Sequence, residues 1–233
     1  MTDVRTRRIP REFTPMTLSL WPAPHVCFAA IDIDIIILDV ARDRYDCLTE
    51  CAEWLTTGED GRLHVDDQEA ADALIDMGVA CDAPGPPARR APAPRRELKI
   101  PPNSTRLEVV RAFIAQAAAT AIFRRGSLLD LIQFECGRTA PFAPWAGVAV
   151  SEARLAELLA AARLARPWIP FEGECLQRAF QLRYYLARFG VATDWVFGVR
   201  TWPFSAHCWL QVGDLVIGDR LERVRRYTPI LTA

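Results

Sequence analysis

Residues 173–190 read GECLQRAFQLRYYLARFG, and they give the clearest structural signal in the chain. Downstream of Cys175, apolar and polar side chains recur at helical spacing, which predicts an amphipathic helix. The apolar positions are Ala179, Leu182, Leu186 and Phe189, and those on the opposite face are Gln177, Gln181, Tyr184 and Arg188. Gly190 is suited to end this helix in the left-handed conformation. Cys175 is therefore expected in the first turn, where unpaired N–H groups and the helix dipole favour a thiolate.

A second informative stretch, SAHCWLQVGDLVIGD, occupies residues 205–219. Its alternating and β-branched residues predict two strands joined by a Gly-Asp turn. His207 lies at the start of the first strand and Asp219 at the end of the second. An imidazole can accept the proton of a thiol, and a carboxylate can orient the imidazole. Cys175, His207 and Asp219 are thus the candidate catalytic residues.

The parity of the connecting turn decides whether His207 and Asp219 share a face of the sheet, because side chains alternate along a strand. A two-residue turn would pair His207 with Arg220 and direct Asp219 to the other face. A three-residue loop at 212–214 would place His207 directly opposite Asp219. Joint catalysis by these residues therefore predicts the three-residue loop. With the shorter turn, Asp194 would be the nearest alternative carboxylate.

Bulk composition excludes several classes of protein. The 233 residues carry a net charge of −1, and their seven cysteines show no disulfide framework. The N-terminus lacks the apolar segment of a signal peptide, and no apolar run is long enough to span a bilayer. We therefore expect a cytoplasmic protein that does not enter a membrane. The Cys and His spacings lack the paired CxxC pattern of structural zinc, and no GxxxxGK[ST] or GxGxxG loop occurs, so no metal and no other cofactor is expected.

Composition also divides the chain into three parts. Residues 30–82 contain fifteen Asp or Glu but only three Arg and no Lys. Residues 84–102 contain seven prolines together with Arg and Lys, a composition that resists helix and sheet. The predicted organisation is a first domain at 20–82, a flexible extended linker at 83–104 and a second domain at 105–233.

The first domain is predicted to be a winged-helix-like module of three strands plus helices. Residues 26–30, 35–40 and 44–48 have the pattern of short strands, and helices are expected at about 49–57 and 66–77, the second with Asp residues at its start. Winged helices often bind DNA. Here about twelve net negative charges would repel a phosphate backbone, so no nucleic acid partner is expected.

The second domain is predicted to pack helices on an antiparallel sheet, which makes the whole chain α+β. Capped helical patterns precede the Cys175 helix at 106–123, 127–134 and 151–167. Residues 194–199 read as a further strand beside the two already described. The loop before His207 carries two aromatic residues, Trp202 and Phe204. Such side chains usually cover the edge of a core, and a substrate-facing role is the alternative.

These motifs occur in the order found in transglutaminase-like (papain-like) thiol enzymes. PF-x-G-x-CL at 170–176 is followed by a helix ending in Arg-Phe-Gly, a Gly-Val strand, AH-x-W-L at 206–210 and a closing Asp. Over about 105–233 the chain resembles the lasso peptide B proteins, which are leader peptidases. In the first domain, HV-x-F-A at 25–29 and DRY-x-CL at 43–48 resemble the RiPP recognition element, the module that such peptidases use to bind a leader and that can be fused to them.

The resemblance implies a cysteine peptidase that binds and removes the leader of a lasso peptide precursor. The leader would add a strand to the edge of the third predicted strand, in a groove completed by the helix at 66–77. The expected substrate-binding residues are Arg44, Tyr45, Asp46, Cys47 and Leu48, together with Trp202 and Phe204. A separate asparagine-synthetase-like cyclase, which uses ATP, would be the partner that acts on the freed amine.

Two alternatives stay open from the residues alone. A transglutaminase-like acyl transferase or amidase would pass through the same thioester as a peptidase. A non-catalytic leader-binding scaffold would keep the fold without the chemistry, although the intact Cys, His and Asp set favours an enzyme. The reactivity of Cys175 toward an alkylating reagent would separate the scaffold from the enzymes.

Overall fold

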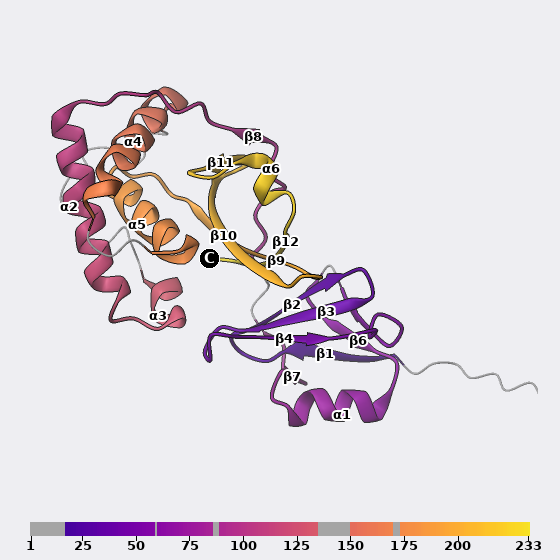
Figure 1. Ribbon diagram of the computed structural model, residues 1–233. Coiled ribbons are helices and arrows are strands. Elements are labelled where there is room, and N and C mark those ends of the chain that lie inside the picture. Colours follow the sequence, from indigo (N-terminus) through magenta and orange to yellow (C-terminus); the bar gives the residue numbers. More distant parts are fainter. Residues whose placement is uncertain (1–16, 59, 86–88, 135–149, 170–172) are drawn as a thin grey trace, which may run out of the picture.

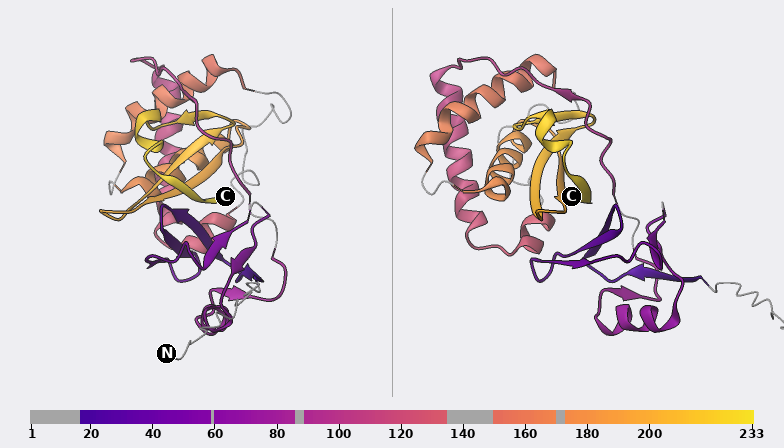
Figure 2. Two further views of the ribbon diagram at one scale, coloured as in Figure 1. Left: turned by 90° about the vertical axis from the view of Figure 1, so that its right-hand side faces the viewer. Right: turned by 45° about the vertical axis from the view of Figure 1, so that its right-hand side comes forward.

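The computed structural model describes residues 17–58, 60–85, 89–134, 150–169 and 173–233. Over these residues the helices and mainly antiparallel sheets make the chain α+β, as predicted. The N-terminal part lies against one end of the C-terminal part, so that strand β2 contacts strand β12 (Figures 1 and 2). None of the helices in the described ranges is both long and apolar enough to cross a bilayer.

The N-terminal part consists of two small sheets and a helix. Its elements are β1 (Leu18–Pro22), β2 (Val26–Ile31), β3 (Asp34–Asp39), β4 (Arg44–Leu48), β5 (Leu55–Thr57), β6 (Leu63–Val65), α1 (Gln68–Asp76) and β7 (Ala80–Cys81). One sheet has the order β2-β3-β4 and the other the order β5-β6-β1-β7. Helix α1 packs against β1, β6 and β7. The groove expected between the third strand and this helix stays a prediction: α1 packs on the second sheet, and Leu48 of β4 packs against the same apolar core as the helix.

The three strands predicted from 26 to 48 are confirmed, and so is the helix that begins after Asp67, whose side chain accepts hydrogen bonds from two N–H groups of the first turn. The helix predicted at 49–57 is wrong. The chain turns at Glu50, where φ is +54°, and then forms β5, in which Leu55 pairs with Val65. Buried Cys51 closes this turn by donating its thiol hydrogen to the Leu48 carbonyl. The module thus has strands where the winged-helix prediction expects a further helix.

The C-terminal part has a five-stranded sheet with its longer helices on one face and its last, short helix on the other (Figures 1 and 2). Its elements are β8 (Arg96–Glu97), α2 (Arg106–Phe123), α3 (Leu128–Gln133), α4 (Glu152–Ala165), a 3-10 turn η1 (Arg166–Trp168), α5 (Cys175–Ala187), β9 (Asp194–Arg200), β10 (Ser205–Val212), β11 (Leu215–Ile217), α6 (Leu221–Val224) and β12 (Thr228–Thr232). The sheet order is β12-β9-β10-β11-β8, and the β8–β11 pairing is parallel. The predicted helices and their Ser127 and Ser151 caps are confirmed.

The Pro- and Arg-rich segment is held against the C-terminal part in its described residues. Arg96 and Glu97 form a short strand beside β11, so the prediction that this segment resists sheet formation is wrong at these two residues. Side chains also hold it: Arg96 pairs with Asp214 and Glu152, and Arg89 pairs with Asp194. Main-chain pairing and ion pairs convert an extended segment into a fixed strap, which corrects the expectation of a flexible linker.

Helix α5 buries the face that was expected to be polar. Gln177, Gln181 and Tyr184 are all buried, and the Gln181 side-chain amide donates a 2.8 Å hydrogen bond to the Thr120 hydroxyl of α2. A buried amide is tolerated when its hydrogen bonds are satisfied, which periodicity alone does not reveal. Gly190 has φ of +73° after the helix, as predicted.

Strand β3 joins the two parts of the molecule because it is buried along its whole length. Ile35 and Ile37 belong to the N-terminal core. Ile36 and Leu38 alternate with them and belong to the large apolar cluster of the C-terminal helices and sheet. The sheet β2-β3-β4 is therefore an internal layer between two cores.

Candidate active site

Cys175 is the first residue of α5, as the sequence predicts. The N-cap residue Glu174 makes no side-chain capping bond, so the first-turn N–H groups are not capped by that residue. The Cys175 side chain is half-buried at the point where α5 meets β10. A thiol at this place combines access for a substrate with the positive end of a helix dipole.

His207 comes from β10 and is 5% exposed. Its ring packs against Tyr227, with ring centroids 5.2 Å apart, and stacks more loosely on Trp209. The residue opposite His207 on β9 is Gly198, where a Cβ atom would lie 2.8 Å from the Trp209 ring. A glycine there leaves room for the aromatic layer that holds the imidazole in place.

The predicted three-residue loop is wrong. Val212 pairs with Leu215, and Leu210 pairs with Ile217, so a two-residue turn joins β10 to β11. Asp219 nevertheless reaches His207, with 2.5 Å between the carboxylate Oδ2 and the imidazole Nε2.

The reason is that β11 ends at Ile217, before the alternation reaches Asp219. Gly218 then adopts φ of +72°, which redirects the chain and releases Asp219 from the parity of the strand. A Cβ atom at Gly218 would also lie 2.7 Å from the Leu182 side chain of α5. The other Asp219 oxygen accepts the Arg220 N–H at 2.7 Å. Asp194, the alternative carboxylate, pairs with Arg89 instead.

The electrostatics of the three residues favour an ion pair. The pKa of the Cys175 thiol is lowered to about 4, first by a hydrogen bond from the Cys208 side chain and then by one from His207. Burial acts to lower the pKa of His207, but its hydrogen bonds with Asp219 and Cys175 outweigh burial and raise it. Burial likewise acts to raise the pKa of Asp219, but the bonds from His207 and from the Arg220 N–H, together with the charges of His207 and Arg223, outweigh burial, so this pKa is lowered. Because Asp219 holds Nε2, Nδ1 is the ring nitrogen left for the thiol.

Cys208 is a contributor that the sequence reasoning did not find. It is buried and belongs to the apolar cluster beside α5, as expected for a side chain on the opposite strand face from His207. Its thiol and its backbone N–H both hydrogen-bond Cys175. The thiolate of Cys175 in turn raises the pKa of Cys208, so that thiol remains a proton donor. Its position directly after His207 was the signal available in the sequence.

The predicted substrate-binding residues fall into two groups. A single pocket is lined by five of them, Tyr45, Asp46, Cys47, Trp202 and Phe204, which come from β4 and from the loop before β10. Arg44 and Leu48 do not line it: Arg44 pairs with Asp46, and Leu48 packs against the N-terminal core. Within the part of the chain that the structure describes, no three His, Cys, Asp or Glu side chains gather to hold a metal ion. Positions 170–172 of the PF-x-G-x-CL motif lie outside the described residues.

Comparison with known proteins identifies the C-terminal domain. Residues 132–232 match the family model Transglut_core3, described as the transglutaminase-like superfamily. No curated protein and no solved structure matches the chain. The matched range contains Cys175, His207 and Asp219. The C-terminal part therefore contains a transglutaminase-like domain over residues 132–232.

Proposed function

We propose that this chain is a cysteine peptidase that removes the leader of a lasso peptide precursor, with Cys175, His207 and Asp219 as its catalytic residues. The observation that carries the proposal is geometric: Cys175 begins α5 where that helix meets β10, and His207 on β10 is held by Asp219 at 2.5 Å. The lowered pKa of Cys175 and the raised pKa of His207 agree with this arrangement. A thiolate next to an imidazolium is the form in which a cysteine nucleophile is ready to attack.

The reaction follows from this arrangement. The Cys175 thiolate forms a C–S bond to the carbonyl carbon of the scissile peptide, and the Cys175 N–H at the helix start is placed to bind the oxyanion. As the C–N bond breaks, the proton on His207 moves to the leaving amine. Neutral His207 then takes a proton from water, whose oxygen attacks the thioester. The C–S bond breaks, the leader leaves as a carboxylate, and the thiolate–imidazolium pair is restored. Asp219 keeps the ring oriented throughout.

The N-terminal part would supply the leader-binding module. Among the described strands, β4 pairs with β3 alone, so its outer edge offers N–H and C=O groups for an added strand. The sequence motifs in β2 and β4 resemble those of the recognition element. A leader held on β4 would be tethered beside the transglutaminase-like domain, at a raised effective concentration. The amine freed by cleavage would pass to the separate ATP-using, asparagine-synthetase-like cyclase.

The test is the mass of lasso-type precursor peptides before and after incubation with the full chain, with and without the cyclase. We expect the masses of a free leader and a core peptide. Cys175→Ala should abolish cleavage while labelled leader still binds, because binding uses β4 and chemistry uses α5. Incorporation of an added amine without hydrolysis would indicate an acyl transferase instead. Leader binding by the unsubstituted chain with no turnover would indicate a scaffold.

A further inference from the structure

The seam between the two parts of the molecule is fixed by the loop that precedes the histidine strand. The Trp202 indole N–H donates a 2.9 Å hydrogen bond to Oδ2 of Asp34 in β3. That carboxylate is 5% exposed, and its other oxygen accepts the Glu50 N–H. The Phe204 ring lies 5.6 Å from the Tyr45 ring of β4. The loop is therefore attached to the N-terminal sheet at two points, just ahead of His207 on β10.

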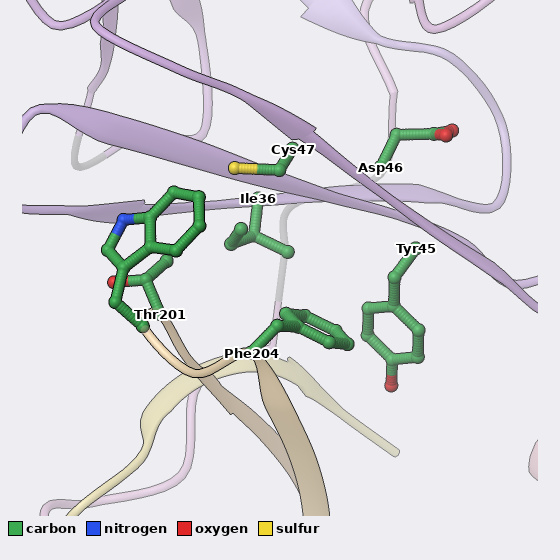
Figure 3. A pocket seen from close by; sticks show the side chains of 7 residues that line it. Ile36, Tyr45, Asp46, Cys47, Thr201 and Phe204 are labelled. Carbon is green, nitrogen blue, oxygen red and sulfur yellow. The ribbon is translucent and has the colours of Figure 1, made fainter.

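A pocket of about 120 Å³ opens at this seam. Figure 3 shows Thr201 and Phe204 extending from the loop toward Ile36, Tyr45 and Cys47 of the N-terminal sheet. The lining is mostly apolar. Asp46 is its one acidic residue, and that carboxylate is paired with Arg44 at 2.8 Å.

The size and lining of this pocket specify its occupant. An enclosed apolar cavity of about 150 Å³ takes a benzene ring, so the smaller volume between the walls of this partly open pocket fits a branched aliphatic or proline side chain better than an indole. A peptide side chain suits this position, because the pocket lies on β4, whose outer edge is unpaired among the described strands. A strand added at such an edge places alternate side chains on the face that carries Tyr45 and Cys47.

The pocket is close to the reacting thiol. Phe204 lines it and directly precedes β10, three residues before His207, which at about 3.3 Å per strand residue puts the pocket about 10 Å from that histidine. Tyr45 also lines it and, like Cys175, packs against the large apolar cluster of the C-terminal part. Burial is the main cause of the raised pKa of the Tyr45 phenol, and the charges of Cys208 and Cys175 add to it. The side chain held in the pocket would therefore belong to a residue near the scissile bond.

We propose that this seam pocket is a specificity subsite of the peptidase, which takes one branched aliphatic or proline side chain of the substrate near the bond to be cleaved. The subsite is built jointly by β4 and the loop at 201–204, so the leader-binding module takes part in choosing the bond as well as in holding the leader. This inference rests on the proposed function.

The exposed thiol of Cys47 allows the pocket to be tested without any cleavage. Cys175→Ala protein is equilibrated with an equimolar mixture of disulfides of N-acyl cysteamines that carry isovaleryl, acetyl, succinyl or indoleacetyl groups. Peptide mapping by mass then gives the adducts on each cysteine. We expect Cys47 to form about ten times more adduct with the isovaleryl group than with each of the other three groups. Tenfold is the lower end of the discrimination that a hydrophobic pocket shows for one missing methylene group. Cys81, which does not line the pocket, serves as the control thiol and should show no preference. Equal adducts on Cys47 would overturn the proposal.

A size change gives the second measurement. Phe204→Ala enlarges the pocket and should shift the preference of Cys47 toward the indoleacetyl group. The matched control Trp168→Ala, which removes an aromatic side chain 75% exposed and outside the pocket, should leave the preference unchanged. An unchanged preference in Phe204→Ala would also overturn the proposal.

Cleavage of side-chain variants of a precursor separates this inference from the proposed function. Cleavage that depends on one branched aliphatic or proline residue near the bond, with the dependence relaxed by Phe204→Ala, supports both. Cleavage that depends on no such residue would refute the subsite proposal and would still support the peptidase function. Selective adduct formation at Cys47 without cleavage of any precursor would refute the peptidase function. The pocket would then be real, but it would not be a peptidase subsite.

Discussion

The pH dependence of Cys175 alkylation tests the ion pair most directly. With a pKa of about 4 against an ordinary value of 9.0, the thiol is at least about nine-tenths ionised from pH 5 to pH 8. Its rate of reaction with iodoacetamide should therefore be flat over this range and should fall only as the pH approaches 4. A thiol of ordinary pKa is only about 0.1% ionised at pH 6, and its rate rises about tenfold per pH unit.

The slope of the alkylation rate against pH tests the ion pair, whereas the absolute alkylation rate does not. A thiolate loses nucleophilicity as its pKa falls, and a shift of about five units costs roughly a factor of 10² to 10^2.5. This loss offsets most of the roughly 10³-fold gain in thiolate at pH 6. The net advantage of Cys175 at that pH is then only about threefold to tenfold, which a difference in exposure could mimic. The flat pH profile has no such alternative cause.

Variants identify the groups that hold the thiolate. Cys208→Ala removes the largest cause of the lowered pKa of Cys175, and His207→Gln removes the next largest. Each substitution should therefore shift the rise of the Cys175 alkylation rate to higher pH. Cys47, exposed and with a raised pKa, supplies the internal control, because its rate should increase throughout the range. The rates are read by quenched mass mapping of each cysteine. A tenfold rise per pH unit at Cys175 between pH 5 and pH 8 in the unsubstituted chain would refute the ion pair.

Three further substitutions test the geometry of the site and of the seam. Asp219→Asn removes the charge that raises the pKa of His207, so this pKa should fall in an NMR titration, and single-turnover cleavage should slow by about 10²- to 10⁴-fold. Gly218→Ala places a side chain at φ of +72° and should lower the free energy of unfolding in urea by about 1–2 kcal/mol; an unchanged value would mean that the turn does not need glycine. Trp202→Ala leaves a buried carboxylate without its indole donor and should cost about 1–3 kcal/mol by the same measurement. Trp168→Ala, at nearly the same exposure, should cost less than about 0.5 kcal/mol, and equal losses would contradict a structural role for the seam bond.

The sequence predicted the features that depend on neighbouring residues. The helix that begins at Cys175, the Ser127 and Ser151 caps and the strands β2, β3 and β4 all follow from patterns within one element. The choice of Cys175, His207 and Asp219 as neighbours was also available, because their order along the chain resembles that of a known class of thiol enzyme. Patterns of this kind are local, and local physics fixes them.

Only the tertiary structure decided the features that depend on a single backbone dihedral angle or on which helix and sheet faces pack together. Strand parity predicted the wrong turn, since alternation stops where β11 stops and Gly218 redirects the chain. The buried glutamine face of α5 depends on a hydroxyl from another helix, Thr120 of α2. Cys208 is a buried core residue, and it contacts Cys175 because α5 docks on β10.

The largest difference concerns the relation between the two domains. Composition gave an acidic module, a proline-rich segment and a second domain, which predicts separate units on a flexible tether. In the structure, Ile36 and Leu38 of β3 enter the C-terminal apolar cluster, while Ile35 and Ile37 stay in their own core. A continuous run of apolar residues indicates burial on both faces of a strand, but it does not indicate what covers each face. Only the packing of the second domain on that strand decides it, and that packing also creates the pocket beside Tyr45.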